Sequence, residues 1–229
     1  MADPSTIVER RRGPLGMPRW AMVAWGVAAV VVVLWAGAWA VAWATQGTAR
    51  STPIPNAQLP VLYDMPMFSL TASDGTIVSD ADLRGGRVIV EFIFTECRLF
   101  CPVMSIRMGE LQAALAQDPS MSDVRLVSIS VDPDNDTPDV LAAYAQRYDA
   151  DPRRWTFLTG PDRATVWRLV EEGFKLPVTD ESENAAMPIG HSGKWLVFDR
   201  HGQARATVTA TQGPTVEQAL EALRAVDAP

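Results

Sequence analysis

An uncharged stretch of 25 residues near the N-terminus divides the chain into parts suited to different surroundings. Residues 20–44 contain no Asp, Glu, Lys or Arg and are rich in valine, alanine and tryptophan. A bilayer core requires about 20 apolar residues in a helix, so this stretch is long enough to span a membrane with some tilt. Trp20 and Trp43 lie at its ends, where aromatic rings favour the headgroup region. The sequence therefore predicts one transmembrane helix over residues 20–44.

The charges beside this stretch predict its orientation. Positive residues flanking a span stay in the cytoplasm, which places residues 1–19 inside and everything after Ala44 outside. A cleaved signal peptide is the alternative, because Ala42-Trp43-Ala44 has a small-x-small pattern, but the apolar region of a signal peptide is only about 7–15 residues long. Since residues 1–19 also lack a transit-like segment, we expect an uncleaved anchor in a bacterial inner membrane and a periplasmic C-terminal part. The flanking basic residues are Arg10, Arg11, Arg12 and Arg19.

The rest of the chain is predicted to be a linker followed by one domain. Residues 45–60 contain three prolines, at 53, 55 and 60, and no apolar periodicity, which indicates an extended linker. Residues 61–229 are enough for one compact domain with its own core. The whole chain has 20 basic and 27 acidic residues, and residues 45–229 hold 16 and 25 of them, a net charge of −9. A domain this acidic is a poor nucleic-acid binder, so that class of partner is excluded.

The domain shows an alternation of apolar strands and helical patterns. The buried strand at 87–94 and the β-branched strand at 124–131 are each followed by a helical pattern, which favours an α/β fold with a mixed sheet. Pro102 and Pro138 suit first helical positions, and Thr137 suits an N-cap. The predicted strands are 67–70, 76–78, 87–94, 124–131, 155–158, 194–198 and 204–209, and the predicted helices are 102–117, 137–148, 162–172 and 215–226.

The only two cysteines, Cys97 and Cys101, lie between the buried strand and the first helix of the domain. Thiols four residues apart at a helix start share one face, and open α/β sheets place their sites at the carboxyl ends of strands. The helix N-terminus also favours the thiolate. A structural disulfide is the alternative, but so short a loop gains little stability from closure. The pair is therefore predicted to bind a soft metal ion or to exchange electrons as a dithiol/disulfide couple.

The motifs around these cysteines resemble those of the Sco/SenC family of membrane-anchored, thioredoxin-fold copper proteins. Phe92–Pro102 is similar to the family's aromatic strand followed by Thr-x-Cys-Pro-x-x-Cys-Pro, and Ser128–Pro138 is similar to its Ser-x-Asp-Pro-x-x-Asp-Thr stretch. Trp155–Gly160 ends in the family's Leu-Thr-Gly, and His191 matches its late histidine. The resemblance extends over residues 20–226 and implies a thioredoxin-like mixed sheet flanked by helices, with one N-terminal transmembrane helix.

The resemblance also implies a metal site formed by Cys97, Cys101 and His191. Two thiolates and one imidazole suit Cu(I), with Cu(II) as a second state, whereas zinc would require a fourth ligand. On spacing alone His191 would be an ordinary loop histidine, and the other histidine, His201, lies in an apparent hairpin turn and is assigned no role. Arg98 stands where the family usually has proline; its cation would favour the thiolate and oppose Cu(II).

The function implied by the resemblance is that of a copper metallochaperone. It would deliver copper, or reducing equivalents, to the copper centre of cytochrome c oxidase, with the oxidase subunit that carries this centre, other copper chaperones or thiol reductases as partners. The alternative from a different class is a membrane-anchored thiol–disulfide oxidoreductase in which Cys97 attacks and Cys101 completes the exchange. A redox or copper sensor is a third possible function. Whether the chain is an enzyme therefore stays open among these three functions.

Three acidic residues after the strand at 124–131 carry a weaker signal. Asp132, Asp134 and Asp136 have the spacing of a calcium loop, but the downstream glycine and glutamate are absent. We therefore expect a strand-end loop in which Asp136 and Thr137 cap the next helix, and Asp132 remains a candidate neighbour of the metal site.

Overall fold

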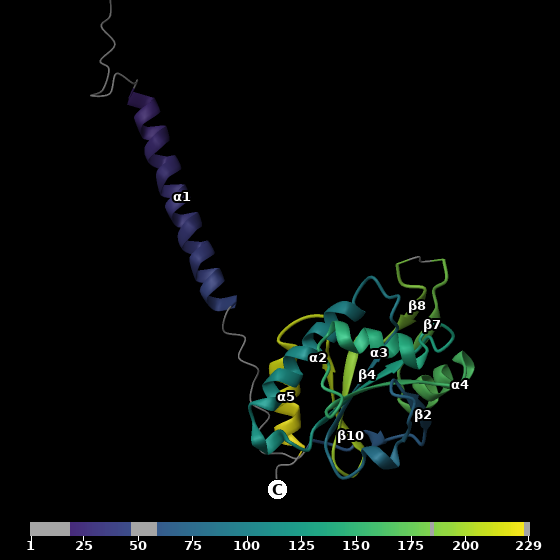
Figure 1. The fold of residues 1–229 in the computed structure, drawn as a ribbon. Coiled ribbons are helices and arrows are strands. Elements are labelled where there is room, and N and C mark those ends of the chain that lie inside the picture. Colours follow the sequence, from purple (N-terminus) through teal and green to yellow (C-terminus); the bar gives the residue numbers. More distant parts are fainter. Residues whose placement is uncertain (1–18, 47–58, 184–185, 227–229) are drawn as a thin grey trace, which may run out of the picture. The chain divides into compact units, whose positions relative to one another are not determined.

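The computed structural model describes residues 19–46, 59–183 and 186–226, which fall into two units, Met1–Pro53 and Ile54–Pro229 (Figure 1). The first unit contains one helix, α1 (Arg19–Gln46). Among the described residues, which in this helix include the side chains of Trp20 and residues 23–39 only, no helix is found that is long and apolar enough to cross a membrane. Of the linker predicted at 45–60, residues 45–46 belong to α1 and residues 47–58 lie outside the described residues, as do the arginines at 10–12.

The second unit is built on an eight-stranded mixed sheet with the order β1-β10-β9-β4-β5-β6-β2-β3. Its centre is parallel, because β4 pairs with β5 and β5 with β6 in the same direction, while the flanking strands are antiparallel. The mixed α/β sheet predicted from the sequence is confirmed. The strands are β1 (Tyr63–Asp64), β2 (Ser69–Ala72), β3 (Ile77–Ser79), β4 (Val88–Ile93), β5 (Arg125–Ser130), β6 (Trp155–Thr159), β9 (Lys194–Phe198) and β10 (Gln203–Thr209).

A second sheet of two short strands, β7 (Val178–Asp180) and β8 (Ile189–His191), was not predicted. Three-residue strands carry too little periodicity to be recognised, and Pro188 and Gly190 interrupt the pattern further. Gly75 lies in the turn that joins β2 to β3, and its φ of +84° is a backbone conformation that favours glycine.

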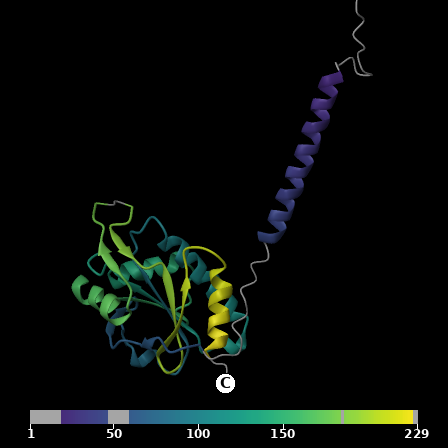
Figure 2. The same ribbon diagram turned by 180° about the vertical axis from the view of Figure 1, so that it is seen from behind.

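Helices cover both faces of the main sheet. The side chains that pack on one face come from α2, α3 and α5, and those on the other face come from α4 and the π-helical turn η3 that continues it. Figure 1 shows α2 beside α5, and Figure 2 shows the same arrangement from behind. The bounds are η1 (Ala81–Leu83), α2 (Cys101–Ala116), η2 (Pro119–Met121), α3 (Pro138–Arg147), α4 (Arg163–Arg168), η3 (Leu169–Gly173) and α5 (Thr215–Ala225).

Local capping explains where two of these helices begin. The side chain of Thr137 accepts a hydrogen bond from the backbone N–H of Val140, as the sequence predicts. Asp162 accepts from the backbone N–H of Thr165 in the same way at α4. The predicted helix over 162–172 is confirmed in position, but its second half is π-helical rather than α-helical.

A carboxyl group lies buried in the middle of the central strand. Glu91 of β4 accepts hydrogen bonds from Ser128 Oγ at 2.7 Å and from Trp195 Nε1 at 2.8 Å. Ser128 Oγ in turn accepts from Trp155 Nε1 at 2.8 Å. No ion pair to Glu91 is found among the described residues, and burial raises its pKa to about 7. The two direct donors, Ser128 and Trp195, stabilise the carboxylate without neutralising its charge, and Trp155 orients Ser128.

We expect Glu91 to make the stability of this domain depend on pH. Its folded-state pKa of about 7 lies above the ordinary value of 4.5, so its stabilising contribution is present below pH 4.5 and is lost as pH rises to about 7. The loss is about 3 kcal/mol of unfolding free energy. Glu91→Gln, which can still accept from Trp195 and donate to Ser128, should remove this slope. Urea unfolding of the unit Ile54–Pro229, followed by tryptophan fluorescence across this pH range, measures it.

Glu171→Gln, a change at an exposed glutamate, is the control and should keep the wild-type slope. The same slope in Glu91→Gln as in the control would show that folding does not raise the pKa of Glu91.

Candidate metal centre

The two thiols are placed by the junction between β4 and α2. After β4 ends at Ile93, a turn brings the backbone N–H of Cys97 to the carbonyl of Phe94 at 3.2 Å. Cys101 is the first residue of α2 and Pro102 follows it, so the helix starts where the sequence predicts. Both cysteines are free thiols; Cys101 is fully buried and Cys97 is 5% exposed.

The third predicted ligand, the imidazole of His191, lies in the small two-stranded sheet. His191 is the last residue of β8, and its partner in the ladder is Val178 of β7. Its Nε2 lies 3.1 Å from the Sγ of Cys101. The two sulfurs and a ring nitrogen of His191 all lie within 4.8 Å of one another. The structure therefore brings together the three residues that the resemblance implied, although 90 positions separate Cys101 from His191.

Aromatic rings fix the orientation of the imidazole. Phe94 lies edge-on to the His191 ring with centroids 5.7 Å apart, and Phe100 lies against it at 5.0 Å. The other ring nitrogen, Nδ1, is 3.3 Å from the carbonyl oxygen of Ser192, a contact that suits a proton on Nδ1 when Nε2 binds a metal ion. The ring is 9% exposed, so apolar contacts and one backbone acceptor hold it toward the sulfurs.

The environment separates the two thiols chemically. The Cys101 thiol acts as a hydrogen-bond donor to Cys97 and lowers the pKa of Cys97 to about 4, with a smaller contribution from His191. Burial raises the pKa of Cys101 well above its ordinary value. Arg98 is exposed and its backbone N–H donates to the carbonyl of Ala186 at 3.1 Å. The main causes of the low Cys97 pKa are therefore Cys101 and His191, and not the cation that the sequence suggested.

Of the three acidic residues after β5, Asp136 stabilises the loop that carries the thiols. The buried carboxylate of Asp136 accepts from the backbone N–H of Thr95 at 3.1 Å, from the Thr95 hydroxyl and from Ser130 Oγ. Burial raises the pKa of Asp136. The expectation that Asp136 caps α3 is wrong, because its oxygens are used by the residue two positions before Cys97, and Thr137 alone caps that helix.

Asp132, kept as a candidate neighbour of the metal site, is instead bound to an arginine. Arg163 lies 2.6 Å from the carboxylate of Asp132 and 3.1 Å from that of Asp134. Neither aspartate belongs to the cluster of possible metal ligands. These acids therefore tie the loop after β5 to α4.

The donor set fits a soft, low-coordinate metal ion. Within the described ranges, Cys97, Cys101 and His191 form the one group of at least three His, Cys, Asp or Glu residues close enough to share an ion. Two sulfurs and one nitrogen suit Cu(I), and a structural zinc site would need a fourth ligand. His201, the other histidine, lies in the exposed turn between β9 and β10 and is not part of this group.

Known proteins are similar to this chain in sequence and in fold. A SCO1 protein homolog of Bacillus subtilis (strain 168) is 34% identical over 138 residues, which are 60% of this chain and 70% of that protein. The structure of BsSco, a member of the Sco family of cytochrome c oxidase assembly proteins in which a disulfide switch was identified, is 27% identical, with a TM-score of 0.66 over 74% of this chain and 98% of that chain. ScoI of Bradyrhizobium japonicum with copper bound is 25% identical, with a TM-score of 0.58 over 70% of this chain and 98% of that chain.

The fold is thioredoxin-like, as the structural likeness to BsSco shows. The SCO1/SenC family profile matches residues 62–226, most of the chain and all three residues of the candidate centre. This chain therefore belongs to the SCO1/SenC family.

Proposed function

We propose that this chain is a copper metallochaperone that holds one copper ion at Cys97, Cys101 and His191 and passes copper, or reducing equivalents, to the copper centre of cytochrome c oxidase. The observation that carries the proposal is the convergence of two sulfurs and one imidazole nitrogen within 4.8 Å. It is supported by the copper bound in ScoI of Bradyrhizobium japonicum and by the assignment of BsSco to the oxidase assembly proteins.

The chain's own residues fit a site that must both hold and release its cargo. Cys97 is ionised at neutral pH and is ready to bind a cation, while Cys101 must lose its proton when the ion arrives. Cys101 is fully buried, whereas Cys97 and His191 are 5% and 9% exposed, so copper enters and leaves on the side of these two residues. Because thiolates exchange as ligands only in the reduced state, the redox state of the pair controls loading.

A second candidate function, thiol–disulfide exchange, is favoured by the same thiol pair. Cys97 has the low pKa and slight exposure expected of an attacking thiol, and Cys101 lies close enough to resolve a mixed disulfide. A disulfide switch was identified in BsSco. In this function the products would be the Cys97–Cys101 disulfide and a reduced partner dithiol, so electrons and protons pass from one pair to the other.

We also propose that residues 20–44 anchor the domain in a bacterial inner membrane, with residues 1–19 in the cytoplasm and the domain in the periplasm. The support is the absence of charge over 25 residues and the arginines that precede them. The oxidase subunit that carries the copper centre would then meet the domain at the periplasmic face of the inner membrane.

Copper stoichiometry tests the leading proposal. The reduced domain, kept anaerobic, should take up one Cu(I) per chain. His191→Ala should weaken binding by about 100-fold or more, since even outer-shell changes at metal sites cost about 10–100-fold. The same variant should lose any thiolate-to-Cu(II) absorption band. Competition with a coloured Cu(I) chelator measures the affinity.

His201→Ala, a change of the other histidine, is the matched control and should bind copper as the wild type does. If the reduced domain binds no copper but reduces the disulfides of insulin rapidly, the oxidoreductase function replaces the chaperone function.

The thiolate can be titrated directly. Cys101→Ala removes the main hydrogen bond to Cys97, so the pKa of Cys97 should rise well above 4 and toward its ordinary value. His191→Ala should raise it less, because the histidine makes the smaller contribution. Thiolate absorbance near 240 nm, followed against pH in the reduced metal-free protein, measures both variants. An equal shift in the two variants would contradict the ranking of the two causes.

Membrane fractionation tests the anchor. The full chain should sediment with membranes and resist extraction by alkaline carbonate, because a spanning helix is held by its apolar length. A truncation that begins at Gly47 should be recovered in the soluble fraction. Release of the full chain by carbonate would exclude residues 20–44 as a span.

A further inference from the structure

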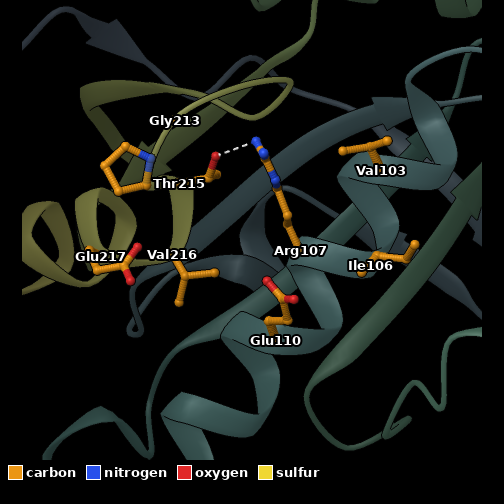
Figure 3. Close-up of a pocket in the computed structure, with 9 residues that line it drawn as sticks. Val103, Ile106, Arg107, Glu110, Gly213, Thr215, Val216 and Glu217 are labelled. Carbon is orange, nitrogen blue, oxygen red and sulfur yellow. Dashed lines mark hydrogen bonds between the residues drawn. The ribbon is translucent and has the colours of Figure 1, made fainter. Parts of the chain in front are cut away.

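A groove next to the thiol loop lies between α2 and the start of α5. It has a volume of about 420 Å³ and is lined by residues of the first three turns of α2 and by residues 213–217. Figure 3 shows Val103, Ile106 and Glu110 along α2, with Val216 and Glu217 across the gap. None of these side chains is a ligand of the proposed metal centre, and the groove begins within one helical turn of Cys101.

An apolar stripe connects the groove to the cysteines. Leu99, which lies between Cys97 and Cys101, is 50% exposed, and Val103 and Ile106 are 39% and 54% exposed. Val103 and Ile106 are three residues apart in α2 and so lie on one side of the helix, and Leu99 lies in the turn that leads into it. Exposed aliphatic side chains occur singly on most surfaces, but a row beside a reactive pair is typical of an interaction site.

The wall of the groove is held rigid by a buried contact. Arg107 of α2 donates to the carbonyl of Ala210 at 2.7 Å and to Thr215 Oγ1 at 2.8 Å, and Figure 3 shows it reaching from one wall to the other. Thr215 is itself buried and donates to the carbonyl of Thr209 at 3.1 Å. The guanidinium is therefore engaged in joining α2 to α5, and its charge is half-buried.

The exposed charges of the groove are both negative. Glu110 lies on the α2 side and Glu217 on the α5 side, and no ion pair to either is found in the described part of the chain. A neutral apolar partner would remove water from these two carboxylates without replacing it, which is unfavourable. A partner that places a lysine or arginine beside an aliphatic side chain would cover the stripe and pair the carboxylates together.

A second copy of the chain fits this surface poorly. In a two-fold dimer the same patch meets itself, so Glu110 and Glu217 of one copy would face the same acids of the other. Residues 45–229 also carry a net charge of −9, which opposes association of two such domains. The charges thus favour a different protein as the occupant.

We propose that the groove between α2 and α5, with the stripe of Leu99, Val103 and Ile106, is the docking surface for a basic, aliphatic segment of the protein that meets the Cys97–Cys101 pair. This inference rests on the proposed exchange of copper or electrons at that pair. Glu110 and Glu217 select the positive charge, and the stripe accepts the aliphatic side chain. A partner held here would have its adjoining surface next to the loop that carries Cys97 and Cys101.

Binding of defined peptides to the full chain tests the proposal. The probe is a short fluorescein-labelled peptide in which a Leu-Ile pair is flanked by lysines, and fluorescence anisotropy reports its affinity. The peptide should bind the wild type, and added salt should weaken binding. The same peptide with glutamate in place of lysine should bind at least about tenfold more weakly.

Two changes in the groove should each reduce affinity for the lysine peptide by about tenfold or more. One is the double variant Glu110→Lys with Glu217→Lys, and its charge-matched control is Glu171→Lys with Glu172→Lys, at two exposed glutamates of η3. The other is Ile106→Asp, and its control is Ile77→Asp at an exposed isoleucine of β3. All six residues are exposed, so circular dichroism spectra should be unchanged.

Three results would overturn the proposal: no binding of the lysine peptide to the wild type, equal binding of the two peptides, or equal loss in a groove variant and its control. A dimer seen by sedimentation that Ile106→Asp disrupts would make a second copy the occupant instead. Copper uptake is measured on the same samples. If the wild type binds the lysine peptide but takes up no copper, the proposed function alone is contradicted. If it takes up copper but does not bind the peptide, the docking surface alone is contradicted.

Discussion

Strand β4 is the element on which the sheet, the core and the candidate centre all depend. It pairs with β5 along its whole length and with β9 along its first half, and all six of its residues are buried. Its alternate side chains enter the two cores that the helices cover. Because β5 pairs with the strand as far as Ile93 and both faces are covered, the end of the strand at Ile93 is fixed in space. The cysteines follow within eight residues of that end, so the sheet places them with little freedom.

A strand end alone does not define the loop that carries the first thiol, and Asp136 supplies the missing constraint. Its carboxylate binds both the backbone N–H and the hydroxyl of Thr95, and it also binds Ser130 at the end of the neighbouring strand. One buried carboxylate thereby joins the ends of β4 and β5 just before Cys97. A buried acid bound by three donors is costly to disrupt, which makes this a stiff support for a loop that must keep two sulfurs close to an imidazole.

The sequence predicted the sheet and the thiol pair more fully than the rest of the centre. Local patterns were enough for β4, β5 and α2, because apolar runs, a proline at the helix start and the cysteine spacing are all short-range signals. His191 could be assigned only through the resemblance, since β8 is three residues long and no local pattern links it to residues 90 positions away. The roles of Asp136 and Glu91 were not foreseen for the same reason. A signal for Glu91 existed, as a glutamate inside an otherwise apolar strand must find buried donors, but the donors on β5, β6 and β9 emerge only from the register.

The proposed exchange of copper or electrons places two opposed requirements on the surroundings of Cys97 and Cys101, which must shield the thiols from water and still let a partner reach them. Burial of Cys101 and contact of His191 with two aromatic rings keep water from the sulfurs. The same burial keeps a partner away from the thiols unless the surface beside them binds that partner. Leu99 lies between the cysteines and is half exposed, so the loop that hides the sulfurs also begins the apolar stripe toward the groove. The turn between β4 and α2 thus has two faces, one that protects the ligands and one that is available to the protein that must reach them.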